Sequence, residues 1–192
     1  MSTVTAENYV IRTVRPHEWP ALRRLRLDAL RDPVAPIAFV EDYEQAAARP
    51  DSFWQERAAR SGAEDGGVRQ VIAEAPDGTW AGTVTVLIEE PGTTDFAGLP
   101  VERRQGHLVG VFVRPEHRGS GLVEALFEAG TEWAWRRGVE RVRLVVHEDN
   151  VRARGAYRKA GFVPSGVVVS FSEDAEDREL ELVLARPSGL DR

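Results

Sequence analysis

The stretch His107–Val123, HLVGVFVRPEHRGSGLV, combines an arginine, two closely spaced glycines and the start of a helical pattern, a combination that can bind an anion. A β-branched run is ended by Pro115, and Gly119 and Gly121 follow just before a helical pattern begins. The first amides of a helix have no partner within the helix and lie at the positive end of its dipole. Arg118 adds a positive charge beside them. The segment therefore predicts a binding site for a phosphate-bearing ligand.

Two familiar nucleotide-binding loops fit this stretch poorly. A P-loop ends in Gly-Lys followed by Ser or Thr, and the chain contains no such sequence. The dinucleotide pattern G-x-G-x-x-G needs a third glycine where Glu124 stands. That pattern also belongs at a first strand-to-helix turn, whereas this loop lies deep in the chain. Both loops are therefore disfavoured.

Length and composition set further limits. The chain has 192 residues, with 25 Lys+Arg against 31 Asp+Glu and a formal charge of −6, which fits one domain over residues 1–192. The acidic balance argues against a protein that mainly binds nucleic acid. No apolar run is long enough to cross a bilayer, and the N-terminus lacks the layout of a signal peptide. Cysteine is absent, which excludes disulfides and thiolate chemistry. We expect a cytoplasmic protein with no membrane or nucleic-acid partner.

The elements that must position the loop follow from the hydrophobic patterns. A hairpin turning at Asp77-Gly78 precedes a strand–helix–strand unit, so the sheet must be mixed and covered by helices. The fold class is therefore α/β, with a mixed, mostly antiparallel sheet of about seven strands and about four helices. Strands are expected at Tyr9–Val14, Val68–Glu74, Trp80–Ile88, His107–Val113, Val142–Val146, Phe162–Phe171 and Glu179–Ala185. Helices are expected at Pro16–Asp32, from Ser52 onward (in capping-box spacing with Gln55), and at Leu122–Arg137 and Val151–Ala160.

The phosphate-binding stretch resembles a known family. Val113–Val123 is similar to the CoA-binding segment of the GNAT N-acetyltransferase superfamily, in which Arg/Gln-x-x-Gly-x-Gly/Ala lies between a strand ending in Val-x-Pro and a long helix. Arg118, Gly121 and Val123 occupy the three marked positions. Val123 stands where the family usually has a smaller residue.

A downstream stretch supports this resemblance. Asn150–Phe162 looks like the family's second half-motif, an Asn followed by a helix that carries Tyr157 and closes with Gly-Phe. The resemblance covers roughly residues 68–184, and the expected order of strands and helices agrees with it. The chain thus resembles a bacterial GNAT protein, which implies a GNAT-like fold and a single N-acetyltransferase domain.

The resemblance implies an activity. A GNAT protein is an acyltransferase that moves the acetyl group of acetyl-CoA to a primary amine of a small molecule or peptide, by direct attack in a ternary complex. Acetyl-CoA would be a co-substrate, and no metal is expected. In the family, the sheet splays between the strands expected here at 107–113 and 142–146, and the pantetheine arm of CoA lies in the opening. A homodimer is expected by analogy alone.

The resemblance also assigns roles by position. Val111 would offer its amide to the thioester carbonyl, Val113 would pair with the pantetheine arm, and Phe112 lies between them. Asn150 would contact the arm from the other side, and Tyr157 would protonate the departing thiolate. The amides assigned to the diphosphate belong to Gly119, Ser120, Gly121, Leu122 and Val123, with Arg118 beside them.

The general base is less well defined by the sequence. His107 begins the central strand and is expected to share a face with Val109 and Val111, so it is the first candidate. Glu89, at the end of the preceding hairpin, is the second, and His147 lies at the end of the next strand. Family members also use a chain of water molecules, so a dedicated base need not exist.

Several residues have structural alternatives. Asn150 is also a good helix N-cap, and Tyr157 also suits a core position. The tryptophans at 80, 133 and 135 are expected in the core or on helix surfaces. Arginines at 136, 137, 141 and 143 are expected to form a solvated patch, and the acidic residues 173–177 a solvated loop.

Two other functions stay open. The chain could be a CoA-binding sensor or interaction protein without catalysis, or a transferase of another acyl group, depending on the space around Val111. The acceptor is not defined by the sequence. Its binding site is expected to involve Trp19–Leu30, Phe53–Arg60, Pro91–Gly106 and the terminal hairpin.

Overall fold

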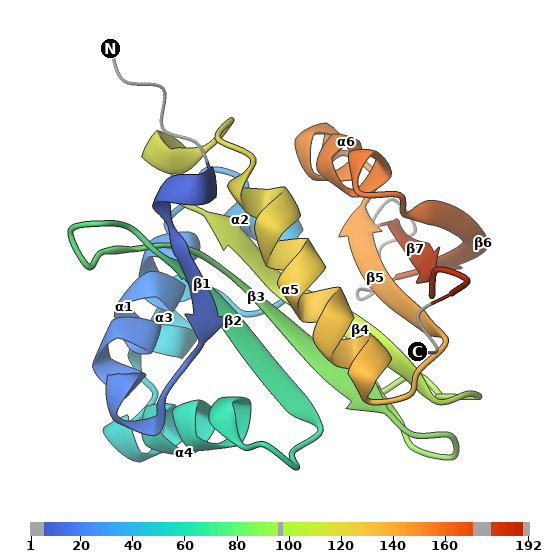
Figure 1. The fold of residues 1–192 in the computed structure, drawn as a ribbon, viewed down its shortest axis with the longest axis horizontal. Coiled ribbons are helices and arrows are strands. Elements are labelled where there is room, and N and C mark those ends of the chain that lie inside the picture. The colour runs from blue at the N-terminus through green and yellow to red at the C-terminus, as the bar shows by residue number, and fades with distance from the viewer. Residues whose placement is uncertain (1–5, 96–97, 171–177, 190–192) are drawn as a thin grey trace.

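Seven strands form one sheet in the computed structural model, which describes residues 6–95, 98–170 and 178–189 (Figure 1). The strand order is β1-β2-β3-β4-β5-β7-β6. Neighbouring strands pair antiparallel except β4 and β5, which are parallel. The expected mixed, mostly antiparallel sheet is confirmed. The strands are β1 (Val10–Thr13), β2 (Val68–Glu74), β3 (Trp80–Glu89), β4 (Gln105–Val113), β5 (Arg141–His147), β6 (Val163–Val169) and β7 (Glu179–Ala185).

Six α-helices accompany the sheet in the described part of the chain, against the four expected from the sequence. They are α1 (Trp19–Ala29), α2 (Ala35–Ala38), α3 (Tyr43–Ala47), α4 (Asp51–Gly62), α5 (Leu122–Arg136) and α6 (Val151–Lys159). The two missed helices, α2 and α3, are too short to show a hydrophobic period. None of the helices described here has the length and apolar character needed to span a membrane.

The capping box expected before α4 was wrong. α4 begins at Asp51 directly after Pro50, with no hydrogen bond from a side chain at its cap. The capping box instead precedes α3, where Asp42 accepts a 2.8 Å hydrogen bond from the amide of Gln45. The backbone amide of Asp42 in turn donates a hydrogen bond to the Gln45 side chain. Ser52 and Gln55 have the same spacing as Asp42 and Gln45, so spacing alone did not distinguish the two positions.

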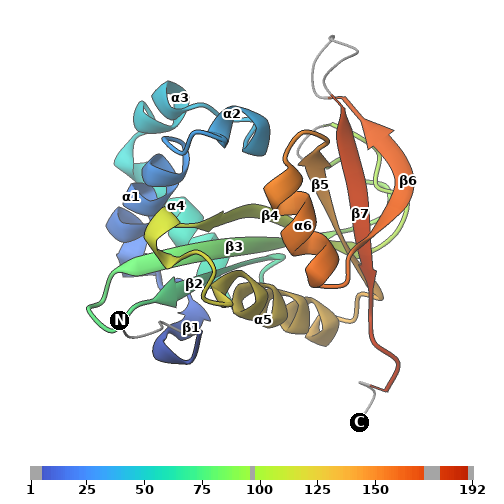
Figure 2. The ribbon, with the colours of Figure 1, turned by 90° about the horizontal axis from the view of Figure 1, so that it is seen from above.

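Two hydrophobic clusters hold helices on opposite faces of the sheet (Figure 2). On one face α5 packs through Leu126 and Trp133, and on the other α1 and α4 pack through Leu25 and Trp54. Trp80 also belongs to the second cluster, and Trp133 and Trp135 to the first, so of the two positions expected for these tryptophans, core or helix surface, all three take the core. The residues 173–177, expected to form an acidic loop, lie outside the described residues.

The central parallel pair separates soon after it begins. β4 and β5 are in register only at Gly106 with Val142 and at His107 with Arg143. Beyond these positions β4 continues to Val113 and β5 to His147 without pairing between them. The sheet therefore splays where the family resemblance predicted, and the unpaired edges of two strands face one opening.

Candidate active site

The opening between β4 and β5 is a cleft of about 920 Å³. Its walls come from β4, β5, the start of α5, and α6 on one side and from α1, α2 and α4 on the other. Backbone amides and carbonyls of the two unpaired strand edges line it together with side chains. A cleft of this size at a break in the sheet is a typical place for a ligand.

A β-bulge reshapes β4 inside the cleft. Thr83 pairs with Phe112 and Thr85 with Val109, so Gly110 and Val111 together oppose the single residue between the two threonines. Gly110 has a φ of +62°, which glycine adopts without steric strain. The bulge takes its backbone groups out of the ladder with β3 at a point where β5 has already left. The amide expected to contact a thioester lies in this bulge.

The bulge also corrects one expectation. His107 and Val109 were expected to share a face with Val111, by simple alternation. The extra residue at the bulge inverts the alternation, so Val111 packs against the cluster beneath α5, whereas Phe112 belongs to the cluster under α1 and α4. The sequence signal was Gly110 in a strand of bulky residues, which often marks a bulge.

The turn before α5 presents a row of open amides. Gly119 and Gly121 have φ values of +75° and +80°, and the first helical hydrogen bond runs from the Ala125 amide to the Gly121 carbonyl. Within the described part of the chain, no backbone hydrogen bond uses the amides of residues 119–123. Four of the five predicted amide positions line the cleft, and Ser120 is the exception, with its hydroxyl donating to the His117 carbonyl. The turn therefore fits a diphosphate.

Arg118 has two protein partners beside this turn. Its Nε donates to the Val113 carbonyl at 2.9 Å, and its Nη2 forms an ion pair with Asp32, just after α1. Burial alone would raise the pKa of Asp32, but the hydrogen bond from Arg118 and that from the Val34 amide hold it below its usual value. Arg118 still lines the cleft, so contact with a phosphate stays a prediction. Its visible role is to hold the loop against the N-terminal helices.

The opposite wall carries Asn150 and Tyr157. The Asn150 side chain accepts a 3.2 Å hydrogen bond from the Ala153 amide, which confirms it as the N-cap of α6. Tyr157 is buried and stacks on Phe127 with ring centroids 5.5 Å apart. Burial, and to a smaller extent the charge of Glu179, raise the pKa of Tyr157 well above its usual range. Both residues line the cleft, so each joins a structural role to a place at the site.

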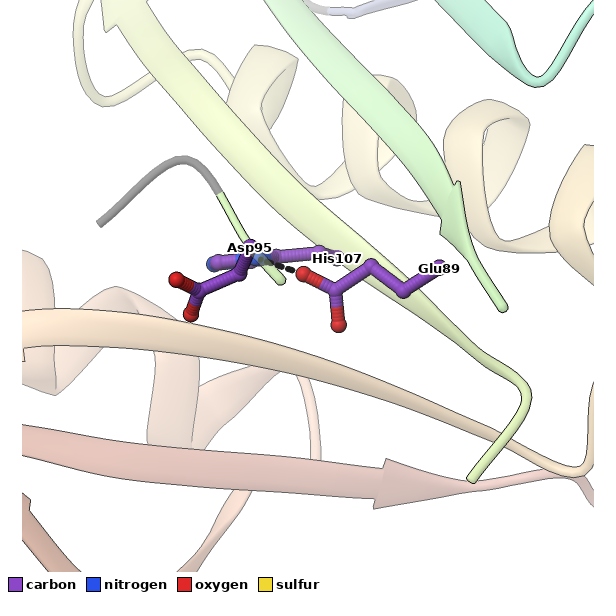
Figure 3. Close-up of side chains that lie close together, drawn as sticks. All are labelled: Glu89, Asp95 and His107. Atoms are coloured by element: carbon purple, nitrogen blue, oxygen red, sulfur yellow. Dashed lines mark hydrogen bonds and ion pairs between the residues drawn. The ribbon is translucent and has the colours of Figure 1, made fainter. Parts of the chain in front are cut away.

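His107 lies at the apex of the cleft with a carboxylate beside it. Its Nδ1 is 2.7 Å from Oε1 of Glu89, and the two side chains are buried (Figure 3). A carboxylate can only accept, so Nδ1 carries the hydrogen and the lone pair of the neutral ring is on Nε2. Burial alone would raise the pKa of Glu89, but hydrogen bonds from His107 and Arg143 lower it to about 2. Of the residues considered as a general base, His107 and His147 line the cleft and Glu89 does not.

Arg143 corrects another expectation. It was assigned to a solvated patch, but it is buried at the apex. Its guanidinium lies 2.9 Å from Glu89, 2.8 Å from Asp95 and 3.2 Å from Glu181. The position in β5 was predicted, but the partners come from strands and a loop far away in the sequence. The pairing of the strands in the structure is needed to show that these three carboxylates lie next to Arg143.

The same contacts bear on a metal site. Glu89, Asp95 and His107 place ligand-type atoms within 4.8 Å of one another (Figure 3). The Arg143 guanidinium already bridges the two carboxylates. It supplies the positive charge that an ion would bring, and like charges repel. The described cluster is therefore an ion-pair network that fixes His107, and it does not fit a metal ion.

The far half of the cleft has a floor of sheet residues and a rim of helix residues. Val68, Leu87 and His107 are in register across β2, β3 and β4, and all three line the cleft. Of the segments expected to bind an acceptor, α1 contributes Arg26, and the region 53–60 contributes a phenylalanine and two arginines. Residues 34–41 also line the cleft and were missed, because the short helix α2 leaves no pattern in the sequence.

Comparison with known proteins agrees with this geometry. A model of the Acetyltransferase (GNAT) family matches residues 19–162. A mycothiol acetyltransferase of Saccharomonospora viridis is 36% identical over 91 residues, which are 47% of this chain and 28% of that protein. The matches span 21% to 60% of the curated relatives' own lengths.

Solved structures share the fold over nearly the whole chain. A GNAT-family acetyltransferase from Streptococcus pneumoniae superposes with a TM-score of 0.72 at 19% identity, covering 93% of this chain and 99% of that one. An N-acetyltransferase from Thermoplasma acidophilum, solved in complex with coenzyme A, gives a TM-score of 0.61 at 18% identity and covers 90% of this chain and 97% of that one. At such identities the likeness shows the fold alone.

Proposed function

Because the chain belongs to the acetyltransferase (GNAT) family, we propose that it is an acetyl-CoA-dependent N-acetyltransferase acting on a primary amine. The acceptor is a small molecule or a peptide amine. One observation carries the proposal: a single cleft joins the open amides before α5, the bulged edge of β4, and the side chains of His107 and Tyr157. Those parts together can hold a diphosphate, bind a thioester and move two protons.

The binding step relies on backbone groups. The amides of the turn at Gly119 and Gly121 bind the diphosphate, and the unpaired edge of β4 extends the sheet onto the pantetheine arm. Asn150 contacts the arm from α6. Acetyl-CoA supplies an acetyl group already activated as a thioester. Fixing it beside the amine removes much of the entropic barrier to their reaction.

The chemical step begins with the amine. His107 accepts the ammonium proton on Nε2, directly or through one water molecule, and Glu89 stabilises the resulting imidazolium through Nδ1. The freed nitrogen lone pair attacks the thioester carbon and forms the C–N bond. The Val111 amide in the bulge donates to the carbonyl oxygen as negative charge develops on it.

The step ends with the thiolate. As the C–S bond breaks, Tyr157 gives its phenolic proton to the departing sulfur, and the second proton of the nitrogen passes to solvent. The raised pKa of Tyr157 keeps the phenol protonated at neutral pH, so its hydroxyl can donate to the sulfur as the C–S bond breaks, and the phenolate then regains a proton from solvent. The products are an N-acetylated amine and CoA with a free thiol. A bacterial origin is part of the proposal, supported by the bacterial sources of similar proteins, and a cytoplasmic location is proposed with it.

Release of the CoA thiol tests the proposal. We expect thiol release from acetyl-CoA with part of a broad panel of primary amines, and slower release from propionyl- and succinyl-CoA. His107→Gln should lower the rate about 100-fold, as loss of a positioned base does. The matched control is His17→Gln, an exposed histidine outside the cleft, which should keep the full rate. Tight CoA binding without thiol release from any amine would instead favour the sensor function.

A further inference from the structure

The far half of the cleft has an excess of positive charge. Arg26 on α1, Arg49 after α3, and Arg57 and Arg60 on α4 gather around a single carboxylate, that of Glu41. Arg26 lies 3.2 Å and Arg49 3.6 Å from that carboxylate. Glu41 is therefore already shared between two guanidinium groups, and the arginines of α4 have no carboxylate of their own at this corner.

Arg57 is the cation in this group that has no close carboxylate partner, because Glu41 pairs with Arg26 and Arg49 and acts on Arg57 only through its charge. It is half-buried and lines the cleft, with its guanidinium 5.9 Å from the centre of the Trp54 ring. Among the described residues, it makes no hydrogen bond or ion pair. Burial, reinforced by the nearby charges of Arg26 and Arg60, lowers the pKa of Arg57 to about 10. A guanidinium that lines the cleft and has donors not used by the protein can bind an anion that enters the cleft.

The register of the sheet places this cation relative to the chemistry. Val68, Leu87 and His107 form one row across three strands of the cleft floor, so two strand spacings, about 10 Å, separate β2 from β4. α4 packs over β2 through Trp54 and Ile72, which belong to one cluster. A molecule lying along this row would have one end at His107 and the other under α4.

We propose that Arg57, with Arg26 and Arg60 beside it, binds an anionic group of the acceptor, a carboxylate or phosphate several bonds away from the nucleophilic nitrogen. This inference rests on the proposed function and adds a substrate class to it. The acceptor is then an amine with a negatively charged far end. The guanidinium fork gives such a group two parallel hydrogen bonds, which fixes the length and orientation of the acceptor along the floor row.

The phosphates of CoA are a different source of negative charge. Their predicted site is the turn before α5, which Arg118 joins to Asp32 after α1, whereas Arg57 lies on α4, which packs over β2. That turn offers its own open amides at residues 119–123. The acceptor is therefore the better match for Arg57, and carrier binding to Arg57 becomes an outcome that the experiment must separate.

Calorimetric titration of the full chain saturated with CoA tests the inference without turnover. The probes are aminohexanoate with its amine on the terminal carbon, hexylamine, and the corresponding diamine. We expect aminohexanoate to bind the wild-type chain about 10- to 100-fold more tightly than hexylamine, and the diamine to bind most weakly. Equal binding of aminohexanoate and hexylamine would overturn the inference and needs no variant.

Variants of Arg57 identify the residue responsible. Arg57→Gln should abolish the preference for aminohexanoate and leave hexylamine binding unchanged, and Arg57→Lys should keep part of the preference. The matched control is Arg24→Gln, an exposed arginine on α1 outside the cleft. Loss of CoA affinity in Arg57→Gln, with the preference retained, would assign the cation to the carrier and contradict the inference.

Thiol-release kinetics separate this inference from the proposed function. With aminohexanoate as acceptor, Arg57→Gln should raise KM with little change in kcat, as expected for a group that only holds the substrate. Equal thiol release with aminohexanoate and hexylamine would leave the function standing and overturn the anionic acceptor. Selective binding of aminohexanoate without thiol release from any amine would support the anion site while contradicting the transferase.

Discussion

The two halves of the cleft present different kinds of groups to a ligand, backbone amides in one and side chains in the other. The half next to the turn before α5, called the carrier half because we propose that acetyl-CoA binds there, uses backbone amides. Gly110, Gly119 and Gly121, all at positive φ, shape the backbone that presents them. The far half of the cleft, called the acceptor half because we propose that the amine binds there, uses side chains, chiefly arginines on α1 and α4 and apolar residues on the floor strands. The halves meet at His107, whose ring is fixed by an ion-pair network at the apex of the sheet.

This difference indicates which half of the cleft can change its ligand specificity through substitution of side chains. A site made of amides depends on backbone shape and recognises a diphosphate and a pantetheine arm whatever the surrounding side chains are. A site made of side chains changes whenever those residues change. The carrier half therefore suits a common co-substrate, and the acceptor half suits an individual one.

Replacing Tyr157 by phenylalanine tests the boundary between the halves with the largest expected effect. The variant keeps the stacking on Phe127 and removes the acid, so turnover should fall about 100- to 10,000-fold. CoA affinity should not change, because it depends on amides elsewhere. Initial rates and calorimetry measure the two quantities, with Tyr43→Phe outside the cleft as control. Full turnover in Tyr157→Phe would make the residue a core aromatic only.

Glu89→Gln tests the apex through stability. The pKa of Glu89 is depressed to about 2 in the fold, so its stabilising contribution is present above its unfolded pKa near 4.5 and is lost as pH falls toward 2. The variant should lower the free energy of unfolding at pH 7 by on the order of 3 kcal/mol. Its stability should also fall less steeply between pH 4.5 and 2. Urea unfolding at several pH values measures both quantities. If the free energy of unfolding falls equally steeply below pH 4.5 in the wild type and in Glu89→Gln, the stabilising role of the Glu89 carboxylate is refuted.

Gly121→Ala perturbs the carrier half alone. Nothing near Gly121 blocks a methyl group, since the closest atom is 3.8 Å from the position of an added Cβ, so the effect comes from its φ of +80°. An L-residue in this region costs about 1–2 kcal/mol, and we expect about 10-fold weaker CoA binding with unchanged acceptor binding. Gly155→Ala, on the exposed face of α6, is the matched control and should bind CoA normally. Equal CoA affinity in the two variants would argue against the amide turn.

Asn150 gives the smallest expected effect and separates its two roles. Asn150→Ala should lower the free energy of unfolding by about 1 kcal/mol through loss of the N-cap, whereas Asn150→Asp should retain the cap. Both variants should weaken CoA binding, since a carboxylate cannot donate to the carrier. Denaturant unfolding and calorimetry measure the two properties. Normal CoA affinity in Asn150→Asp would leave only the capping role.

The carrier half was largely predictable from the sequence, for a physical reason. Its geometry needs glycine at particular backbone positions and a helix immediately afterwards, and both leave marks over a few consecutive residues. The strands Val68–Glu74 and Glu179–Ala185 were also predicted with the bounds observed, the first from the Asp-Gly turn of its hairpin and the second from alternation.

The acceptor half and the apex were not predictable in the same way. Arg143 looks like a surface residue until pairing brings Glu89 and Glu181 from neighbouring strands to its guanidinium. The bulge at Gly110 inverts which side chains share a face, and simple alternation cannot show this. The sequence also does not show that Glu41 pairs with Arg26 and Arg49, which leaves Arg57 without a close carboxylate partner.

The central claim is that the amides of the β4 bulge and of the turn before α5 bind the carrier. A backbone amide NMR spectrum recorded during titration with CoA tests it most directly. We expect the largest shifts on Val111 and on residues 119–123, with small shifts on α1 and α4. Saturable binding with those amides unmoved, or no binding at all, would contradict it.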